Sequence, residues 1–267
     1  MSGPDRPKTM LAWRKEYKSK EPMRVEVPVP SAAEDELLIK VHAAGVCHSD
    51  IAILESTEPP PGFRHLDSFT LGHEGCGEVV FTGAKVTNFT IGDMVSIMSF
   101  AGCLEPTCAE CSRGFTQLCA DGHHYGLDID GSFAPYIAIR AAAAIKLPKG
   151  VSAAAGAVAT DAITTAYHAV VERAQVKCRE TILLYGLGGL GFNALQIILS
   201  LGARIIAVDK RQAVLEEAIK LGVPREDVVP PDAKSVTDWI QERQLVIDKV
   251  VDFLGLPETF ESAIQTG

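Results

Sequence analysis

The pattern of apolar and polar positions changes near the middle of the chain. Before about Ala144, short stretches alternate apolar and polar residues and are separated by closely spaced glycines and prolines. This pattern is typical of the strands of a small β-barrel or sandwich. The predicted strands are 23–29, 36–43, 75–82 and 93–98.

From about Ser152 onward, apolar strands alternate with segments of helical spacing. The predicted strands are 181–185, 205–208, 228–229 and 249–254, and the predicted helices are 153–171, 190–201, 212–221, 236–244 and 258–265. Alternation of this kind indicates a parallel sheet with crossover helices, and therefore an α/β domain. We place the boundary at Pro148-Lys149-Gly150, which gives two domains, 1–150 and 151–267.

Composition narrows the class of protein. The 267 residues are 47% hydrophobic and 22% charged, which indicates a folded globular chain rather than a disordered one. The net charge of −9 argues against nucleic acid or an anionic membrane as the main partner. Residues 1–20 contain no apolar stretch of the kind found in secretory signals, so we expect a cytoplasmic location. Residues 181–203 carry no charge, but their many glycines favour a nucleotide-binding loop over a membrane span.

A glycine-rich loop of the form G-x-G-x-x-G directly follows the first predicted strand of the α/β domain. Gly186 permits a tight turn, Gly188 lets the backbone approach a pyrophosphate, and Gly191 lets helix and strand pack closely. The free N–H groups at the start of the next helix favour an anion. The loop residues expected to bind a dinucleotide are Gly186, Gly188, Gly189, Leu190 and Gly191. The alternative is a glycine-rich turn that binds no nucleotide.

A carboxylate, Asp209, ends the next predicted strand, at about the spacing where such a group accepts a hydrogen bond from the adenosine ribose 2′-OH. An aspartate here repels a 2′-phosphate, so NAD is favoured over NADP. Lys210 and Arg211 follow directly and could weaken that preference. Asp209 and Lys210 therefore join the expected cofactor-binding residues.

Four of the seven cysteines, Cys103, Cys108, Cys111 and Cys119, lie in one short segment rich in loop-forming residues. An odd number of cysteines without a secretion signal does not indicate a disulfide framework. Four thiolates close together suit a closed tetrahedral zinc site, whose role would be structural. The alternative is a set of reduced loop cysteines.

Two further motifs are Gly45-Val-Cys47-His48-Ser49-Asp50 and Leu71-Gly72-His73-Glu74-Gly75. Together with the four-cysteine segment and the glycine loop, in this order, they make the chain resemble the zinc-containing alcohol dehydrogenases of the medium-chain dehydrogenase/reductase superfamily. The resemblance extends from about Met23 to Gly267. It implies a GroES-like β-barrel catalytic domain followed by a Rossmann domain. It also implies two Zn²⁺ ions per chain, and hydride transfer between an alcohol and NAD.

The resemblance implies a role for each residue of the two motifs. Cys47 and His73 match ligands of the catalytic zinc, and Glu74 matches a nearby or exchanging carboxylate ligand. The position of a further ligand, often cysteine in the family, is Asp161 here. Zinc accepts sulfur, nitrogen and oxygen donors, so this exchange is chemically ordinary. Asp161 could instead cap a helix.

Other matches concern the reaction and the cofactor. Ser49 matches the hydroxyl that accepts the substrate proton, and His48 matches a residue that contacts the cofactor pyrophosphate. Asp50 matches a carboxylate that orients His73, and Thr165 matches a residue beside the nicotinamide. The catalytic residues implied are Ser49, His48 and Glu74. The alternatives are a solvated loop imidazole for His48 and an ordinary turn hydroxyl for Ser49.

Three features depart from the family pattern. The cysteine spacing places two extra residues after Cys103, so that Glu105 occupies the expected first position and could replace Cys103 as a ligand. Ala52 stands where many members carry a proton-relay histidine. The chain ends after about four predicted strands of a Rossmann sheet, which has six when complete. We therefore expect a truncated product that lacks the family's usual dimer edge and leaves strand 249–254 unprotected.

Two other readings stay open at this stage. A truncated paralogue could bind zinc and nucleotide without turnover. A zinc-free quinone or enoyl reductase could share the fold, although the intact Cys47, His73 and Glu74 argue against it.

Overall fold

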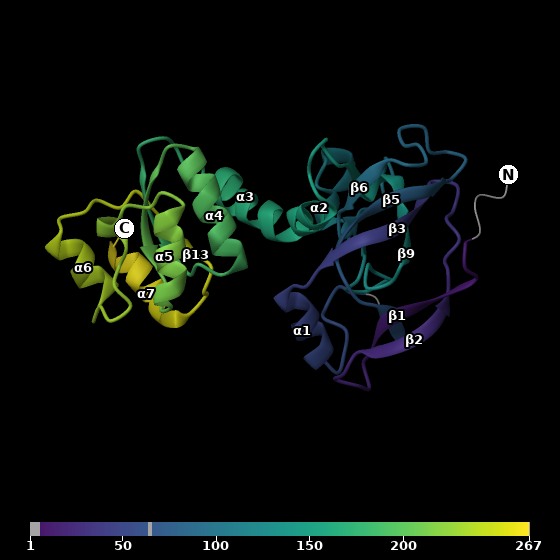
Figure 1. Ribbon diagram of the computed structural model, residues 1–267, viewed down its shortest axis with the longest axis horizontal. Helices are drawn as coiled ribbons and strands as arrows, with labels where there is room; N and C mark the ends of the chain where they lie inside the picture. Colours follow the sequence, from purple (N-terminus) through teal and green to yellow (C-terminus); the bar gives the residue numbers. More distant parts are fainter. Residues whose placement is uncertain (1–5, 64–65, 267) are drawn as a thin grey trace. The chain divides into compact units, whose positions relative to one another are not determined.

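The computed structural model describes residues 6–63 and 66–266, and the chain divides into two compact units, Met1–Asp161 and Ala162–Gly267 (Figure 1). The units divide within the helical stretch that follows the predicted boundary at residue 150. The assignment of 1–150 and 151–267 to a catalytic and a nucleotide-binding domain stays a prediction. In the described part of the chain, no helix has both the length and the apolar character needed to cross a membrane.

The first unit is built mainly from antiparallel strands. A five-stranded sheet has the order β10-β6-β5-β3-β9, and a three-stranded sheet has the order β2-β1-β4. The strands are β1 (Thr9–Glu16), β2 (Met23–Pro28), β3 (Glu36–Gly45), β4 (Ser68–Thr70), β5 (Glu74–Thr82), β6 (Met94–Ile97), β9 (Tyr136–Arg140) and β10 (Ala144–Lys146), with a small pair of β7 (Phe100–Ala101) and β8 (His123–His124). Alternate residues of the five-stranded sheet, such as Leu37, Ile39, Val95 and Ile137, form a buried core. The antiparallel β domain predicted from the alternating pattern is confirmed.

The sequence pattern located four strands of this unit, β2, β3, β5 and β6, but missed its other strands, β1 among them, and the helix α1 (His48–Glu55). In β1 the exposed positions carry Leu11 and Trp13, whereas Lys15 is fully buried. The apolar residues therefore do not mark the inner face of this strand. Helix α1 has only two buried residues, Asp50 and Ile53, so it gives almost no amphipathic signal.

The second unit contains a three-stranded parallel sheet of order β12-β11-β13, formed by β11 (Thr181–Tyr185), β12 (Arg204–Val208) and β13 (Lys249–Asp252). The helices are α4 (Gly189–Ser200), α5 (Gln212–Lys220), α6 (Val236–Glu242) and α7 (Pro257–Thr266). Ile182 and Leu184 pack on one side of β11 with residues of α4 and α5, and Leu183 packs on the other side with α6. The parallel sheet with helices on both faces is therefore confirmed. The predicted strand at 228–229 is only an isolated bridge between Ala207 and Val228.

The predicted helix at 153–171 is interrupted in the structure. It consists of α2 (Ala153–Val158), a π-helical segment Ala159–Ile163, α3 (Thr164–Tyr167) and a second π-helical segment, His168–Arg173. The stretch begins where Ser152 Oγ accepts a hydrogen bond from the backbone N–H of Ala155. Single π turns inside α-helices occur frequently at functional sites.

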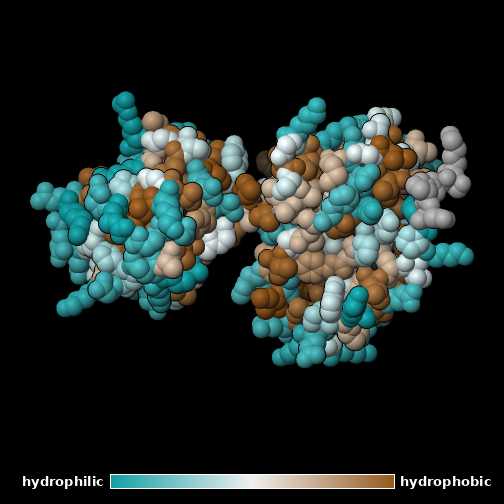
Figure 2. All heavy atoms as spheres, in the orientation of Figure 1, coloured by the Kyte–Doolittle hydropathy of each residue, from teal (hydrophilic) through white to brown (hydrophobic). Residues whose placement is uncertain are grey.

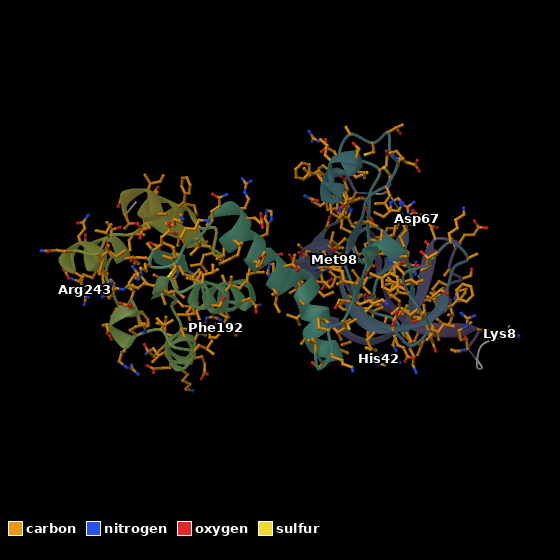
Figure 3. The ribbon with its side chains drawn as sticks, turned by 90° about the horizontal axis from the view of Figure 1, so that it is seen from above. Lys8, His42, Asp67, Met98, Phe192 and Arg243 are labelled. Atoms are coloured by element: carbon orange, nitrogen blue, oxygen red, sulfur yellow. The ribbon has the colours of Figure 1, made fainter. Side chains whose placement is uncertain are left out.

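Hydrophilic and hydrophobic side chains are distributed differently on the visible faces of the two units. In Figure 2, hydrophilic side chains cover most of the visible face of the second unit, and hydrophobic residues on the first unit lie in groups among polar ones. Figure 3 labels Phe192 of α4, which packs partly buried against the core, and Arg243, whose guanidinium lies 4.0 Å from the centre of the Trp239 ring.

Candidate metal centres and nucleotide-binding loop

The first candidate site begins where strand β3 passes into helix α1. Cys47 is the residue that precedes the helix, and its backbone N–H donates to Asp50 Oδ2 over 2.9 Å. This bond satisfies a group at the helix start and fixes the position of Cys47. Asp50 is only 3% exposed, so its carboxylate is held inside the protein.

The same carboxylate orients a buried histidine. His73 Nδ1 lies 3.1 Å from Asp50 Oδ1, and His73 Nε2 lies 3.2 Å from Asp161 Oδ2. Asp50 therefore connects the backbone of Cys47 to the ring of His73, while the other ring nitrogen faces Asp161. A carboxylate behind the ring is the arrangement that fixes the tautomer of a metal-binding histidine.

Glu74 completes the group at the start of β5. It pairs across the sheet with Gly45, and a Cβ atom at position 45 would lie 1.9 Å from Glu74 Oε2. Only glycine at position 45 therefore leaves room for this carboxylate. The ligand atoms of the mixed cluster, which we define as Cys47, His73, Glu74 and Asp161, all lie within 4.8 Å of one another.

Asp161 reaches the mixed cluster from the π-helical segment Ala159–Ile163. The residues that precede the flanking helices α2 and α3 are Ser152 and Ile163, so Asp161 does not stand at an N-cap position. The extra residue of a π turn rotates the side chains that follow it, and this local geometry is not visible in the sequence pattern.

The electrostatics of the mixed cluster suit a cation. Burial lowers the pKa of His73, but its hydrogen bonds to Asp161 and Asp50 outweigh this and raise the pKa to about 11. Burial and the charge of Asp161 raise the pKa of Glu74 to about 7. A positive charge among these side chains is therefore strongly stabilised. Sulfur, nitrogen and carboxylate oxygen donors at this mutual distance fit a zinc ion.

The two residues that open helix α1 lie beside this cluster. Ser49 Oγ is 3.7 Å from Cys47 Sγ, and the side chains of Ser49 and His48 are exposed. Both can therefore meet a molecule that approaches the cluster from solvent. Ala52 lies one turn further along α1 and has no group that can carry a proton.

The four-cysteine cluster, Cys103, Cys108, Cys111 and Cys119, forms a second compact group of donors. All four Sγ atoms lie within 4.8 Å of one another, with Cys103 Sγ 3.8 Å from Cys111 Sγ and Cys108 Sγ 3.8 Å from Cys119 Sγ. Backbone N–H groups of Cys111 and Glu110 lower the pKa of Cys108 to about 7. Four sulfur donors at these distances fit a closed tetrahedral zinc site.

The structure brings Cys103 to this cluster in spite of its longer spacing. Leu104 adopts a left-handed backbone conformation with φ of 62°, which turns the chain sharply after Cys103. Arg140 Nη1 donates to the carbonyl oxygens of Gly102 and Cys103 over 2.8 and 3.2 Å and holds this turn in place. Glu105 is not part of the group of donors.

The glycine loop of the second unit has the geometry that the motif predicts. Gly186 has φ of +80°, and a Cβ atom on Gly191 would lie 1.8 Å from the carbonyl oxygen of Gly186. Around Gly188 and Gly189, a Cβ atom would meet no described atom within 4 Å, so the loop is open there. Helix α4 starts at Gly189 without a side-chain cap or an acidic residue in its first turn. Its N-terminus is therefore suited to an anion.

Asp209 lies directly after β12 and beside the glycine loop. Its Oδ2 accepts from the backbone N–H of Leu187 over 2.8 Å, and Arg211 donates to both of its oxygens. The hydrogen bond from the Arg211 side chain is the main cause that lowers the pKa of Asp209 to about 2. The sequence indicated the carboxylate but not the pairing with Arg211.

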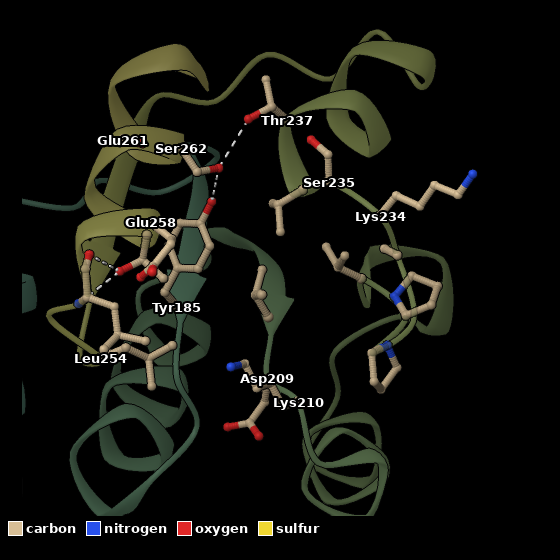
Figure 4. Close-up of a pocket in the computed structure, with 18 of the residues that line it drawn as sticks. Tyr185, Asp209, Lys210, Lys234, Ser235, Thr237, Leu254, Glu258, Glu261 and Ser262 are labelled. Carbon is tan, nitrogen blue, oxygen red and sulfur yellow. Dashed lines mark hydrogen bonds between the residues drawn. The ribbon is translucent and has the colours of Figure 1, made fainter.

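A cavity of about 690 Å³ opens beside Asp209 and Lys210 at the carboxyl ends of the parallel strands (Figure 4). Tyr185 Oη and Ser262 Oγ are 2.7 Å apart on its wall, and Thr237 Oγ1 lies 3.1 Å from Ser262 Oγ. None of these three hydroxyls belongs to a motif, so sequence reasoning missed them. Thr165, expected near the nicotinamide, lies on α3 with its side chain exposed.

Comparison with known proteins agrees with the motifs. Residues 33–149 match the family described as "Alcohol dehydrogenase GroES-like domain", and residues 189–266 match the family described as "Zinc-binding dehydrogenase". Alcohol dehydrogenase 1 of Caenorhabditis elegans is 38% identical over 187 residues, which cover 69% of this chain and 52% of that protein. The chain thus spans about half the length of that curated relative.

Two longer matches cover nearly the whole chain. Alcohol dehydrogenase of Geobacillus stearothermophilus is 31% identical over 249 residues, which cover 92% of this chain and 72% of that protein. The structure of acetophenone reductase from Geotrichum candidum in complex with NAD is 31% identical, has a TM-score of 0.82, and covers 98% of this chain and 74% of its own. With its GroES-like first part and its partial Rossmann sheet, the chain belongs to the zinc-type alcohol dehydrogenase family of the medium-chain dehydrogenases/reductases.

Proposed function

We propose that this chain carries the zinc- and nucleotide-binding parts of a dehydrogenase that transfers a hydride between an alcohol and NAD. The observation that supports this most directly is the mixed cluster, in which one sulfur, one nitrogen and two carboxylates converge with Asp50 behind His73. A purely structural site has no need for an exposed hydroxyl such as Ser49 beside it.

The mixed cluster would hold the catalytic zinc through Cys47, His73 and Asp161, with Glu74 near enough to exchange as a ligand. A zinc ion held at this position would act as a Lewis acid, which would lower the pKa of an alcohol hydroxyl or polarise a carbonyl. The four-cysteine cluster would hold a second zinc with a structural role, because four thiolates leave no open position.

The protein side chains carry out the remaining steps. Asp50 accepts from Nδ1 of His73 and so leaves the lone pair of Nε2 available for a ligand bond. The Ser49 hydroxyl accepts the substrate proton and passes it to solvent, which its exposure allows. No histidine follows at position 52, so the proton leaves by this short route rather than through a side-chain relay.

The glycine loop would position the cofactor that receives the hydride. N–H groups at the start of α4 bind the pyrophosphate, and the open space at Gly188 and Gly189 admits it. From the family resemblance we assign His48 to the pyrophosphate and Thr165 to the nicotinamide. Leu190 and Lys210 contribute to the same cofactor contacts.

Metal content is the first test. Native mass spectrometry of the purified chain should find two zinc ions per folded molecule, and Cys47→Ala and Cys103→Ala should each lose one. Asp161→Cys supplies the thiolate more usual in the family and should retain both. A folded wild-type chain without zinc would contradict the proposal.

Turnover is the second test. NADH formation at 340 nm with a panel of primary and secondary alcohols should depend on zinc and fall by about 10²–10⁴-fold in Ser49→Ala, the range for a lost proton acceptor. Reduction of acetophenone, followed in the opposite direction as consumption of NADH, is tested beside the panel because one structural relative is an acetophenone reductase. A chain that binds zinc and NAD but turns over none of the panel would favour the non-catalytic alternative.

A further inference from the structure

The carboxylate expected to bind the cofactor ribose is already saturated by protein donors. Asp209 Oδ1 accepts from the backbone N–H and from Nε of Arg211, each over 2.9 Å. Asp209 Oδ2 accepts from the backbone N–H of Leu187 over 2.8 Å and from Nη2 of Arg211 over 2.9 Å. A carboxylate offers about four lone-pair positions. A ribose hydroxyl that donates to Asp209 must therefore displace one of these bonds.

The charge that a ligand meets at this position is that of the arginine. The Asp209 side chain is 5% exposed, whereas the Arg211 side chain is 58% exposed. The bidentate pair is close to neutral as a whole, and the aspartate is the buried partner. Lys210 and Lys234 line the cavity beside it (Figure 4). The repulsion that an unpaired aspartate exerts on a 2′-phosphate is thus largely cancelled here.

One donor group of the arginine is still available. Arg211 uses its Nε and Nη2 atoms for Asp209, and Nη2 also for the carbonyl oxygen of Leu187. Its Nη1 group takes part in no hydrogen bond within the described ranges of the chain. Arg211 can therefore keep its bonds to Asp209 and still donate to a phosphate oxygen, with the charge assistance typical of arginine–phosphate contacts.

From this geometry we propose that Arg211 determines the cofactor specificity of the loop, and that the site accepts the 2′-phosphate of NADP as well as the free ribose of NAD. The inference rests on the proposed function, because it presumes that a dinucleotide binds at the glycine loop. It extends the sequence expectation, in which Asp209 favours NAD and Lys210 and Arg211 could weaken that preference. The sequence shows both residues, but only the structure shows that Arg211 donates to both oxygens of Asp209.

Binding of cofactor fragments tests this without turnover. Isothermal titration of the wild-type chain with ADP-ribose and with 2′-phospho-ADP-ribose should give dissociation constants within about tenfold of each other. Arg211→Ala should weaken the 2′-phosphorylated fragment by about 10- to 100-fold, the range for loss of one charge-assisted contact. The same variant should bind ADP-ribose as well as wild type or better, because it frees Asp209.

Two further variants separate charge from folding. Arg211→Gln retains side-chain hydrogen bonding without the charge and should also lose the 2′-phosphorylated fragment selectively. Arg225→Ala removes an exposed arginine that pairs with Glu216 outside the cavity and should change neither constant.

The possible failures are distinguishable. Wild-type chain that binds ADP-ribose but binds the 2′-phosphorylated fragment more than about tenfold less tightly would overturn the inference and leave the proposed function intact. Equal losses of both fragments in a folded Arg211→Gln variant would also overturn it. Wild-type chain that binds neither fragment would refute nucleotide binding itself, and the inference with it.

Discussion

The two candidate metal-binding clusters of the first unit hold four donors each, but they are built in different ways. The four-cysteine cluster comes from one continuous segment, whose loop geometry brings its sulfur atoms together. The donors of the mixed cluster come from the residue before α1, from the residues around the start of β5 and from a π turn, which lie far apart in the sequence. We therefore expect a metal to order the segment of the first cluster, whereas the second cluster needs the whole β fold before a metal can bind. We expect stability to depend on the first cluster and activity on the second.

The largest expected effect is on the thermal stability of the chain, which should fall much more when the four-cysteine cluster loses a ligand than when the mixed cluster does. Cys108→Ala should lower Tm by more than about 10 °C, because a structural zinc contributes its binding energy to folding. Cys47→Ala should lower Tm by less than about 3 °C while abolishing turnover. Differential scanning calorimetry with zinc analysis measures both. Equal losses of Tm in the two variants would contradict the division between a structural and a catalytic cluster.

The difference between the clusters also explains what the sequence could predict. The cysteine segment and the glycine loop are continuous motifs, so their chemistry is visible in the spacing. The contact of His73 with Asp161 depends on a π turn, and the inclusion of Cys103 depends on the left-handed conformation of Leu104. Neither backbone irregularity follows from residue type, because Leu and Ala adopt such conformations only under the constraint of surrounding structure.

The secondary structure was predictable where the buried positions of an element carry the apolar residues that its pattern requires. Strand 181–185 is buried from Ile182 to Tyr185 in a parallel sheet and was located at both ends. Strand β1 was not predicted because its buried position 15 carries a lysine. Residues 228–229 have the apolar character of a strand, but the chain makes only one bridge there.

The buried lysine provides the second prediction. Lys15 Nζ donates to the carbonyl oxygens of Ser19, Leu54 and Ser56 over 2.8 to 2.9 Å, and the last two lie at the end of α1. Lys15→Met should destabilise the chain by about 2–4 kcal/mol, because buried carbonyls lose a charged donor. Urea unfolding measures this.

The position of Lys15 ties its effect to one cluster. Lys15 holds the end of α1, which begins beside Cys47. In the Lys15→Met variant, the mixed cluster should therefore lose its zinc at a lower urea concentration than the four-cysteine cluster. Lys18→Met, at an exposed position nearby, is the matched control and should behave as wild type. A Lys15→Met chain that loses both zinc ions together would show that the lysine supports the whole unit rather than α1.

A smaller effect is expected from adding one methyl group beside Glu74. Gly45→Ala places a Cβ atom where Glu74 Oε2 lies, so the carboxylate must move away from the mixed cluster. The cost in stability should be about 1–3 kcal/mol, the range for overpacking. Zinc analysis should show weaker retention at this cluster alone. Gly189→Ala adds the same group where no described atom is within 4 Å and should leave the zinc content unchanged.

The smallest expected change in stability comes from Asp50→Asn, which keeps an oxygen that can accept from Cys47 N–H but removes the charge behind His73. Zinc affinity of the mixed cluster should fall by about 10–100-fold, as for other carboxylates behind a metal-binding histidine. Competition with a chromophoric chelator measures this affinity. Arg140→Met is the corresponding change at the four-cysteine cluster, where the arginine donates to the carbonyl oxygens of Gly102 and Cys103 and also pairs with Asp35 over 3.8 Å. It should leave the affinity of that cluster within about threefold of wild type, because four thiolates bind zinc without a carboxylate behind them. Equal weakening of zinc binding by the two variants would contradict this difference between the clusters. It would mean that residues outside the ligand set matter as much for the four-cysteine cluster as for the mixed cluster.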